Sequence, residues 1–300
     1  MFPTIPANSA TAASGNTEGI FGFGATASNT NITNLVSNAG VVASDQAATT
    51  GTARYTSAAC EYGEDKGIFG FGNSGSRVSI TNLVSNTGVV ASDTAGVGTA
   101  RWGPSACGYG EDKGIFGYGR NNGSNVNMTN LVSNTGVVAS DQAATTGTGR
   151  YGSSACEYGE DKGIFGFGNS GSRVSVTNLV SNTGVVASDT AGVGTARQAS
   201  AACSYGEDKG IFIFGNDGSP CDITNLVSNA GVVASDVTGV GTARKAPAAT
   251  QYGGDKGIVV FGNALPNTNI SNLISNTGVV SSDVAGIGTA RYSAPACSFN

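Results

Sequence analysis

The motif Gly-Ile-Phe-Gly-Phe-Gly, or a close variant of it, recurs six times along this chain of 300 residues. The copies start near Gly19, Gly67, Gly114, Gly163, Gly210 and Gly257. A repeat of about 48 residues that contains several turn signals is typical of a propeller blade built from four short strands. We therefore predict an all-β fold, in which six units form the six blades of one β-propeller domain spanning residues 16–300.

Four antiparallel strands can be placed in the second unit from its turn signals. They are predicted over residues 57–62, 66–71, 78–84 and 88–91, with Gly-, Asn- and Asp-containing turns between them. The scarcity of strong helix formers and the 47 glycines of the chain agree with strands and turns rather than helices. Each unit is thus predicted to be a four-stranded meander.

The second strand of the unit is apolar on both faces. Because side chains alternate along a strand, Ile68 and Gly70 face one side while Phe69 and Phe71 face the other. Both faces must be covered, as they are when sheets stack around an axis. We expect the glycine to let the neighbouring sheet approach and an aromatic ring of that neighbour to fill the space.

The sixth unit departs from this pattern in a compensating way. It carries Val259 at the place of a phenylalanine and Val260 at the place of a glycine. A loss of volume on one face together with a gain on the other is what a packed stack of sheets would tolerate.

The order of motifs within the unit resembles the kelch repeat of galactose-oxidase-like β-propellers. It runs from an Arg through Ser-Ala-Ala-Cys, Asp-Lys-Gly-Ile-Phe-Gly-Phe-Gly and a third strand to Gly-Val-Val and Thr-Ala-Arg. Kelch units usually carry a double glycine and a Trp, where this chain has Gly72-Asn73 and Val89-Val90. The segment Thr-Asn-Leu-Val-Ser-Asn-Thr-Gly-Val-Val also resembles kelch-like proteins of marine bacteriophages.

Two segments, one near each end of the chain, could form the first strand of the first blade. Residues 9–14 and the tail 293–299 both match the first strand of the unit, and only the tail keeps the preceding Arg291 and the cysteine. We predict that residues 293–299 close the ring as the inner strand of the first blade, and that residues 1–15 form a peripheral arm or attachment segment. The alternative is that the tail begins a seventh blade.

One face of the predicted propeller varies between units, whereas the other keeps nearly uniform turns. The variable positions are the residue after each conserved Arg and the loop after the second strand. The candidate binding residues on this face are Tyr55, Trp102, Tyr151, Gln198, Lys245, Tyr292, Arg77, Arg120, Asn121, Asn122, Arg173 and Asp217. Aromatic rings among Asn, Ser and Arg suit a sugar or a polar protein surface, although neutral drift in loops also produces such variation.

One arginine and one aspartate recur at fixed positions in every unit. They are Arg54, Arg101, Arg150, Arg197, Arg244 and Arg291, and Asp45, Asp93, Asp141, Asp189, Asp236 and Asp283. They could surround the channel mouth and hold an anion, or pair so that an Asp ending one strand and an Arg opening the next fix the connecting loop. Their constancy favours the second role, as structural repeat anchors.

Composition argues against several function classes. The net charge is −5 and no basic block occurs, which argues against nucleic-acid binding. No apolar run is long enough to insert into a membrane, and the N-terminus has no secretory signal.

Catalytic and metal chemistry also find little support in the sequence. The chain has no histidine, so the copper chemistry of galactose oxidase does not carry over, and no sialidase-type Asp-box turn occurs. Five of the six cysteines share one repeat position, where a buried apolar role is favoured over a redox or metal ring. A calcium loop at residues 216–222 is a weak alternative, because the segment is too short. We predict no enzyme activity, no catalytic residue, no metal and no cofactor.

These observations favour a recognition module: a virion-associated or extracellular adhesin whose variable face binds a host-surface glycan or protein. One alternative is a structural virion component that contacts other virion proteins in a larger assembly through its uniform face. A third is an intracellular kelch adaptor, because the absence of a signal leaves a cytoplasmic location open.

Overall fold

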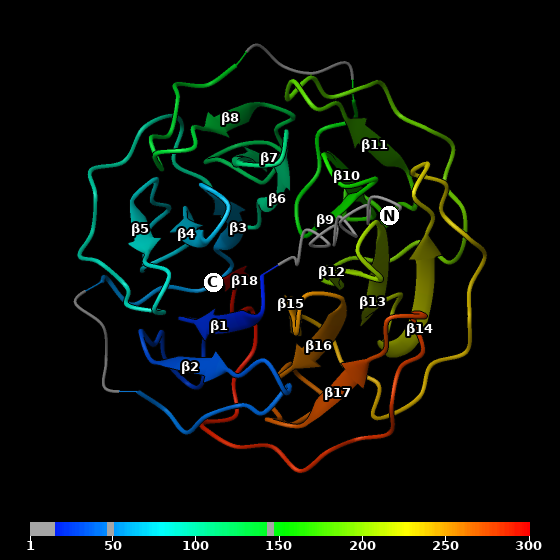
Figure 1. The fold of residues 1–300 in the computed structure, drawn as a ribbon. Coiled ribbons are helices and arrows are strands. Elements are labelled where there is room, and N and C mark those ends of the chain that lie inside the picture. Colours follow the sequence, from blue (N-terminus) through cyan, green and yellow to red (C-terminus); the bar gives the residue numbers. More distant parts are fainter. Residues whose placement is uncertain (1–15, 47–50, 143–146) are drawn as a thin grey trace, which may run out of the picture.

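The computed structural model describes residues 16–46, 51–142 and 147–300. It is all-β, with six three-stranded antiparallel sheets in a propeller-like arrangement around a common centre (Figure 1). No helix occurs within these three ranges. The arm predicted for residues 1–15 and the candidate strand at residues 9–14 lie outside the described residues.

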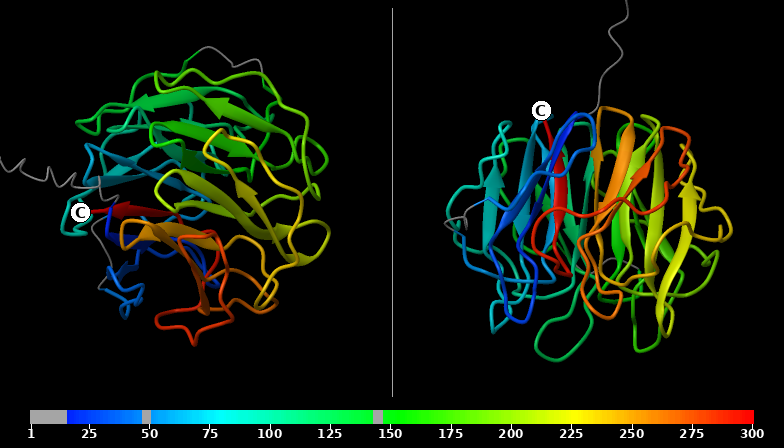
Figure 2. Two further views of the ribbon diagram at one scale, coloured as in Figure 1. Left: turned by 45° about the vertical axis from the view of Figure 1, so that its right-hand side comes forward. Right: turned by 90° about the horizontal axis from the view of Figure 1, so that it is seen from below.

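The strands in chain order are β1 (Glu18–Gly22), β2 (Thr33–Val36), β3 (Ala58–Tyr62), β4 (Lys66–Gly70), β5 (Thr81–Val84), β6 (Ser105–Tyr109), β7 (Lys113–Gly117), β8 (Thr129–Val132), β9 (Ser154–Tyr158), β10 (Lys162–Gly166), β11 (Thr177–Val180), β12 (Ala201–Tyr205), β13 (Lys209–Asn216), β14 (Pro220–Val227), β15 (Ala248–Tyr252), β16 (Lys256–Val260), β17 (Ser271–Ile274) and β18 (Ala296–Phe299). Seen from the side, the strands run from one flat face of the molecule to the other (Figure 2).

Five sheets are built from consecutive strands, and the sixth joins the two ends of the described chain. In that sheet the order is β18-β1-β2, and Ile20 of β1 lies opposite Cys297 of β18. The innermost strands of the six sheets are β3, β6, β9, β12, β15 and β18 (Figure 1). These inner strands contact one another in the order β3, β6, β9, β12, β15, β18, and β18 also contacts β3. The tail therefore occupies the inner position of the first unit.

The prediction of four strands per unit is wrong, because each sheet has three. The segment expected as the fourth strand, residues 88–91, makes only one isolated bridge, with Val90 opposite Val84, and a second bridge follows it, with Thr94 opposite Thr81. The register shifts by one residue between these two bridges, as in a β-bulge. The side chain of Asn82 fills the gap, since its Nδ2 donates to Ala91 O (3.0 Å) and to Asp93 Oδ1 (2.9 Å). A side chain thus replaces the backbone ladder at the outer edge.

The second and third strands are shorter than predicted. β4 ends at Gly70, directly before Phe71, which has a φ of 60°, and an aromatic residue occupies a left-handed conformation at this place in every unit. In the fifth unit the strand continues past its equivalent, Phe214, to Asn216 after a register shift. Such a conformation costs on the order of 1–3 kcal/mol for a residue other than glycine. The third strand begins at Thr81 rather than residue 78, except in the fifth unit, where β14 is eight residues long.

The expected packing of glycine against an aromatic ring between sheets is present. A Cβ placed on Gly70 would lie 2.8 Å from Cζ of Phe116 in the next sheet, and one on Gly117 would lie 2.8 Å from Cζ of Phe165. Only glycine therefore allows the sheets to approach to this distance without displacing the ring.

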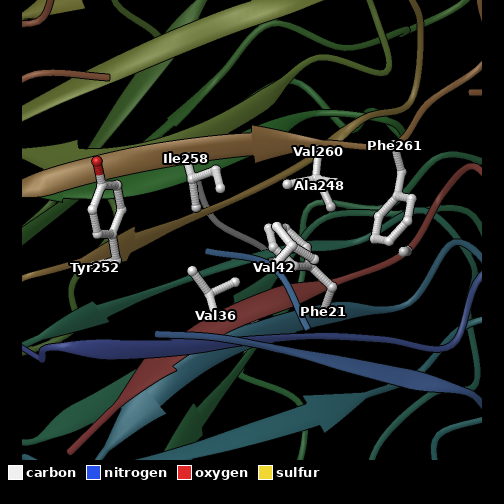
Figure 3. Close-up of a cluster of buried hydrophobic side chains, with 9 residues drawn as sticks. Phe21, Val36, Val42, Ala248, Tyr252, Ile258, Val260 and Phe261 are labelled. Atoms are coloured by element: carbon white, nitrogen blue, oxygen red, sulfur yellow. The ribbon is translucent and has the colours of Figure 1, made fainter. Parts of the chain in front are cut away.

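The compensation in the sixth unit lies across a sheet interface. The fifth unit has Ile213 where the first four units have glycine, and this side chain shares a buried cluster with Val259. The larger residue in one sheet thus faces the smaller one in the next. Val260, on the other face, packs in a cluster with Phe21 and Phe261 (Figure 3).

The six cysteines are free and buried. Five of them pack on the first glycine of the following second strand; for example, a Cβ on Gly114 would lie 2.5 Å from Sγ of Cys60. In the sixth unit Thr250 takes this place against Gly19. The repeated thiol therefore fills space between sheets.

Candidate functional site

Two cavities follow the inner strands. The first, of about 650 Å³, is lined by the ends of these strands, and the second, of about 430 Å³, by their beginnings. Both are bordered by the same ring of alanines, namely Ala59, Ala106, Ala155, Ala202, Ala249 and Ala296. The second cavity lies on the side of the variable residues and is the candidate site.

Five of the six variable residues that follow the conserved arginines line the second cavity. They are Trp102, Tyr151, Gln198, Lys245 and Tyr292. The sixth, Tyr55, is not among the lining residues, but its ring centroid lies 6.4 Å from that of Tyr292. All six side chains are half-buried. The structure thus gathers residues that are about 47 positions apart in the sequence around one opening.

Each variable residue is held by backbone pairing with the variable loop of its own unit. Trp102 N–H donates to Arg120 O (3.2 Å), and Arg120 N–H donates to Trp102 O (2.9 Å). Tyr151 makes the same pair of bonds with Asn169. The two sets of variable positions therefore lie on one face of the molecule.

The next residue of each unit belongs to a circle of backbone hydrogen bonds. Every N–H in the circle donates to the carbonyl of the equivalent residue in the preceding unit, at 2.7–3.1 Å, and all six residues have positive φ. The members are Thr56, Gly103, Gly152, Ala199, Ala246 and Ser293. This circle fixes the backbone from which the variable side chains project.

The aromatic residues are concentrated on one side of the opening. The rings of Trp102 and Tyr151 lie 4.8 Å apart at 55°, and the Arg120 guanidinium lies 5.8 Å from the Tyr151 ring. Gln198 and Lys245 follow in the next two units. The opening therefore offers aromatic faces on one part of its rim and hydrogen-bonding groups on another.

The candidate residues of the variable loops lie outside the cavity lining. Arg77 Nη1 donates to Asn122 Oδ1 (2.8 Å), and Arg173 Nη2 donates to Asn216 Oδ1 (3.0 Å). Both bonds join the loops of neighbouring units. These side chains connect adjacent loops around the outer part of the same face.

Two further loop residues stabilise their own turns. Asn121 Oδ1 accepts from the backbone N–H groups of Gly123 and Ser124, both at 3.1 Å. Asp217 Oδ1 accepts from Ser219 N–H at 3.2 Å. Their side chains therefore shape the loops that they belong to.

The conserved arginines are buried between neighbouring units and line neither cavity. The Arg101 guanidinium lies 3.9 Å from the centroid of the Phe71 ring, and its Nη2 donates to Asn130 Oδ1 (2.7 Å). Burial lowers the pKa of Arg101 to about 10, with an opposing contribution from the charge of Asp141, so the group is a cation at neutral pH. The anion ring considered from the sequence is absent from the lining of both cavities.

Each conserved aspartate accepts hydrogen bonds from the threonine that lies two residues before the arginine of its own unit. Asp93 accepts from the N–H of Thr52 (3.1 Å) and lies 3.9 Å from Nη1 of Arg54. Burial raises the pKa of this carboxyl, but hydrogen bonds from Thr52 and Asn82 outweigh that effect and the net pKa is lowered. The partner of each Arg is therefore the Asp that follows it in the unit, rather than the one that precedes it.

Glu61 and Glu157, which line the first cavity, are not among the residues expected from the sequence. Their recurrence at one repeat position is visible in the sequence, but the cavity that both line exists only when the six sheets are assembled. Within the described ranges, no group of three or more His, Cys, Asp or Glu side chains could hold a metal ion, and this includes residues 216–222.

No helix within the described part of the chain is long and apolar enough to span a membrane. Comparison of the chain with protein-family models and with curated proteins gives no match.

Proposed function

We propose that this chain is a non-enzymatic recognition module whose second cavity binds a glycan. In this proposal the fold is a six-bladed, kelch-like β-propeller closed by the C-terminal strand. The pairing of β18 with β1 and the circle of backbone hydrogen bonds support the closure. The observation that carries the function is the gathering of five variable side chains around one opening of an otherwise repetitive molecule.

The chemistry of the opening suits a saccharide. The faces of Trp102 and Tyr151 can pack on the C–H faces of a sugar ring, and Gln198 and Lys245 can bind its hydroxyl groups. A cavity of about 430 Å³ lies within the usual range for small-ligand sites and can hold the end of a glycan chain. The backbone circle keeps the side chains in place before binding, which lowers the entropic cost.

This activity fits a virion-associated or extracellular adhesin that attaches to a host-surface glycan. The test is a glycan array followed by calorimetry with the best ligand. Trp102→Ala and Tyr151→Ala should each weaken binding at least about tenfold, equivalent to about 1.4 kcal/mol. Val185→Ser, at a residue that is 65% exposed outside both cavities, is the matched control and should bind like the wild type. Absence of any glycan ligand, or equal binding by all variants, would refute the proposal.

A structural role in a larger assembly is the second candidate, and one observation favours it. Each unit exposes one valine in its uniform Gly-Val-Val segment, with 59% to 65% of the residue accessible. The residues are Val41, Val89, Val137, Val185, Val232 and Val279. Under this alternative Val185→Ser would impair incorporation into a particle, whereas Trp102→Ala would not.

A further inference from the structure

The two cavities of the molecule differ in charge. Among the described residues, six glutamates line the first cavity, and neither Lys nor Arg does. The second cavity has the opposite composition, because within the same part of the chain Lys245 is its only charged lining residue. The low-dielectric walls of a cleft concentrate the field of the charges that line it. A negatively charged group is therefore repelled by the first opening and attracted by the second.

Lys245 differs from the other five lysines of the chain in having no counter-ion. Each of those five forms an ion pair with the aspartate directly before it, as Lys209 does with Asp208 at 2.6 Å. The ammonium group of Lys245 makes no ion pair and no hydrogen bond with any described residue. An ammonium group forms its strongest hydrogen bonds with anionic acceptors. The half-buried Lys245 is therefore ready to bind an anionic group of a ligand.

The backbone of Lys245 has a fixed position at the opening. Its N–H donates to Asn263 O (3.1 Å), and its carbonyl oxygen accepts from Asn263 N–H (2.8 Å). The next residue, Ala246, belongs to the circle of backbone hydrogen bonds. The neighbouring units contribute Gln198 and Tyr292 to the same lining. A ligand group that reaches Lys245 thus also meets an amide and an aromatic ring.

The outer part of the same face adds positive charge. The variable loops carry Arg77, Arg120 and Arg173, and Asp217 is their only acidic residue. These loops span residues 25–29, 73–77, 120–124, 169–173, 216–220 and 263–267. Arg77 and Arg173 donate to asparagine side chains, and the Arg120 guanidinium lies 5.8 Å from the Tyr151 ring. Such charges attract an anion over a distance of about 8 Å at physiological ionic strength.

The lining also contains neutral polar atoms that have no partner. Oγ of Ser57 and Oε1 of Gln198 are buried and make no hydrogen bond with a described residue. A buried polar atom without a partner is unfavourable, so a sugar hydroxyl that reaches either atom would gain a hydrogen bond. The opening can therefore bind the uncharged part of a sugar without Lys245.

We propose that the second cavity selects a glycan that ends in an acidic sugar, and that Lys245 binds the carboxylate or sulfate group of this sugar. This inference rests on the proposed function and goes beyond it, because a neutral glycan needs only the aromatic and uncharged groups of the opening. The aromatic side chains hold the apolar faces of the glycan, and Lys245 determines its charge. Lys245 is thus the specificity-determining residue of the site.

The test compares matched glycans on one array. They end in galactose, glucose or mannose, and each of these sugars is presented in its neutral form, as the uronic acid and as the 6-sulfate. The wild type should bind at least one acidic form at least about tenfold more tightly than the matched neutral form. The uronic acid and sulfate arms show which acidic group the site takes.

Variants of Lys245 assign the preference to this residue. Lys245→Gln should weaken binding of the acidic form at least about tenfold and leave binding of the neutral form within about twofold of the wild type. Lys245→Arg keeps the charge and should keep the preference. Lys209→Gln removes the same charge from a side chain outside both cavities, and this matched control should bind like the wild type. Far-UV circular dichroism checks that each variant is folded.

A salt titration of the wild type needs no variant. Raising NaCl from about 0.05 M to about 0.5 M should weaken binding of the acidic form and leave that of the neutral form nearly unchanged. Equal binding of neutral and acidic forms would overturn this inference and leave glycan recognition intact, and so would a Lys245→Gln variant that keeps the preference. Absence of binding to any glycan would instead refute the proposed function, and this inference with it.

Discussion

The backbone N–H of Thr56, in the second unit, donates a hydrogen bond of 3.1 Å to the carbonyl oxygen of Ser293, near the C-terminal end of the chain. This bond completes the circle of six equivalent bonds beneath the variable side chains. It also links the position of the C-terminal tail to the geometry of the candidate site, because Tyr292 directly precedes Ser293. The tail therefore contributes to both the fold and the opening.

Removal of residues 293–300 should destabilise the whole molecule. β1 would lose its inner partner, and the buried side chains of Cys297 and Phe299 would leave the space between sheets. The loss of one buried aromatic side chain alone costs about 3–5 kcal/mol. Urea denaturation followed by far-UV circular dichroism measures the effect, with Val279→Ser as an exposed control in the last unit. A truncated chain with an unchanged urea midpoint would show that the tail is dispensable.

Ile213 and Val259 should behave as a coupled pair. Ile213→Gly leaves a cavity and Val259→Phe overfills the same interface, and each change should cost about 2–4 kcal/mol. The double variant restores the glycine–phenylalanine contact that the first four units make with the next sheet and should recover more than about 1 kcal/mol of the summed loss. A double-mutant cycle in urea measures this coupling. Strict additivity would mean that the two side chains do not share one packing site.

Arg101→Ala should be strongly destabilising without a direct effect on ligand contacts. It removes the stacking on Phe71 and leaves the buried Asn130 without its donor. The expected loss is about 3–5 kcal/mol. Arg173→Ala, at an exposed arginine, is the matched control and should cost less than about 1 kcal/mol. Similar urea midpoints for the two variants would contradict the structural role of the buried arginine.

The conserved aspartates should make the fold sensitive to acid. Folding lowers the pKa of Asp93, so its stabilising contribution is present above the unfolded value near 3.8 and is lost as the pH falls below it. The urea midpoint of the wild type should therefore drop between pH 5 and pH 2. Asp93→Asn should have a lower midpoint at pH 7 and a smaller drop on acidification. A variant with the same drop as the wild type would show that this carboxylate does not contribute.

The repeat period predicted the all-β class and the six units, because a recurring motif requires recurring local structure. The number of strands could not be predicted, since the bulge at Ala91–Asp93 depends on where the side chain of Asn82 lies. Likewise, the sequence pairs the smaller Val259 with the larger Val260 of the same unit, whereas the packing partner of Val259 is Ile213, which could be identified only across the interface. The sequence places the residues after each Arg on one face, but it does not predict the cavity that five of them line.

The measurement that tests glycan recognition most directly uses Trp102, which is the only tryptophan in the chain. Its fluorescence should be followed during titration with the glycan selected on the array, in parallel with calorimetry. If the ligand packs on the opening of the second cavity, Trp102 emission changes in a saturable way, with the affinity that calorimetry gives. Binding detected by calorimetry without any change in Trp102 emission would place the ligand elsewhere and contradict the account.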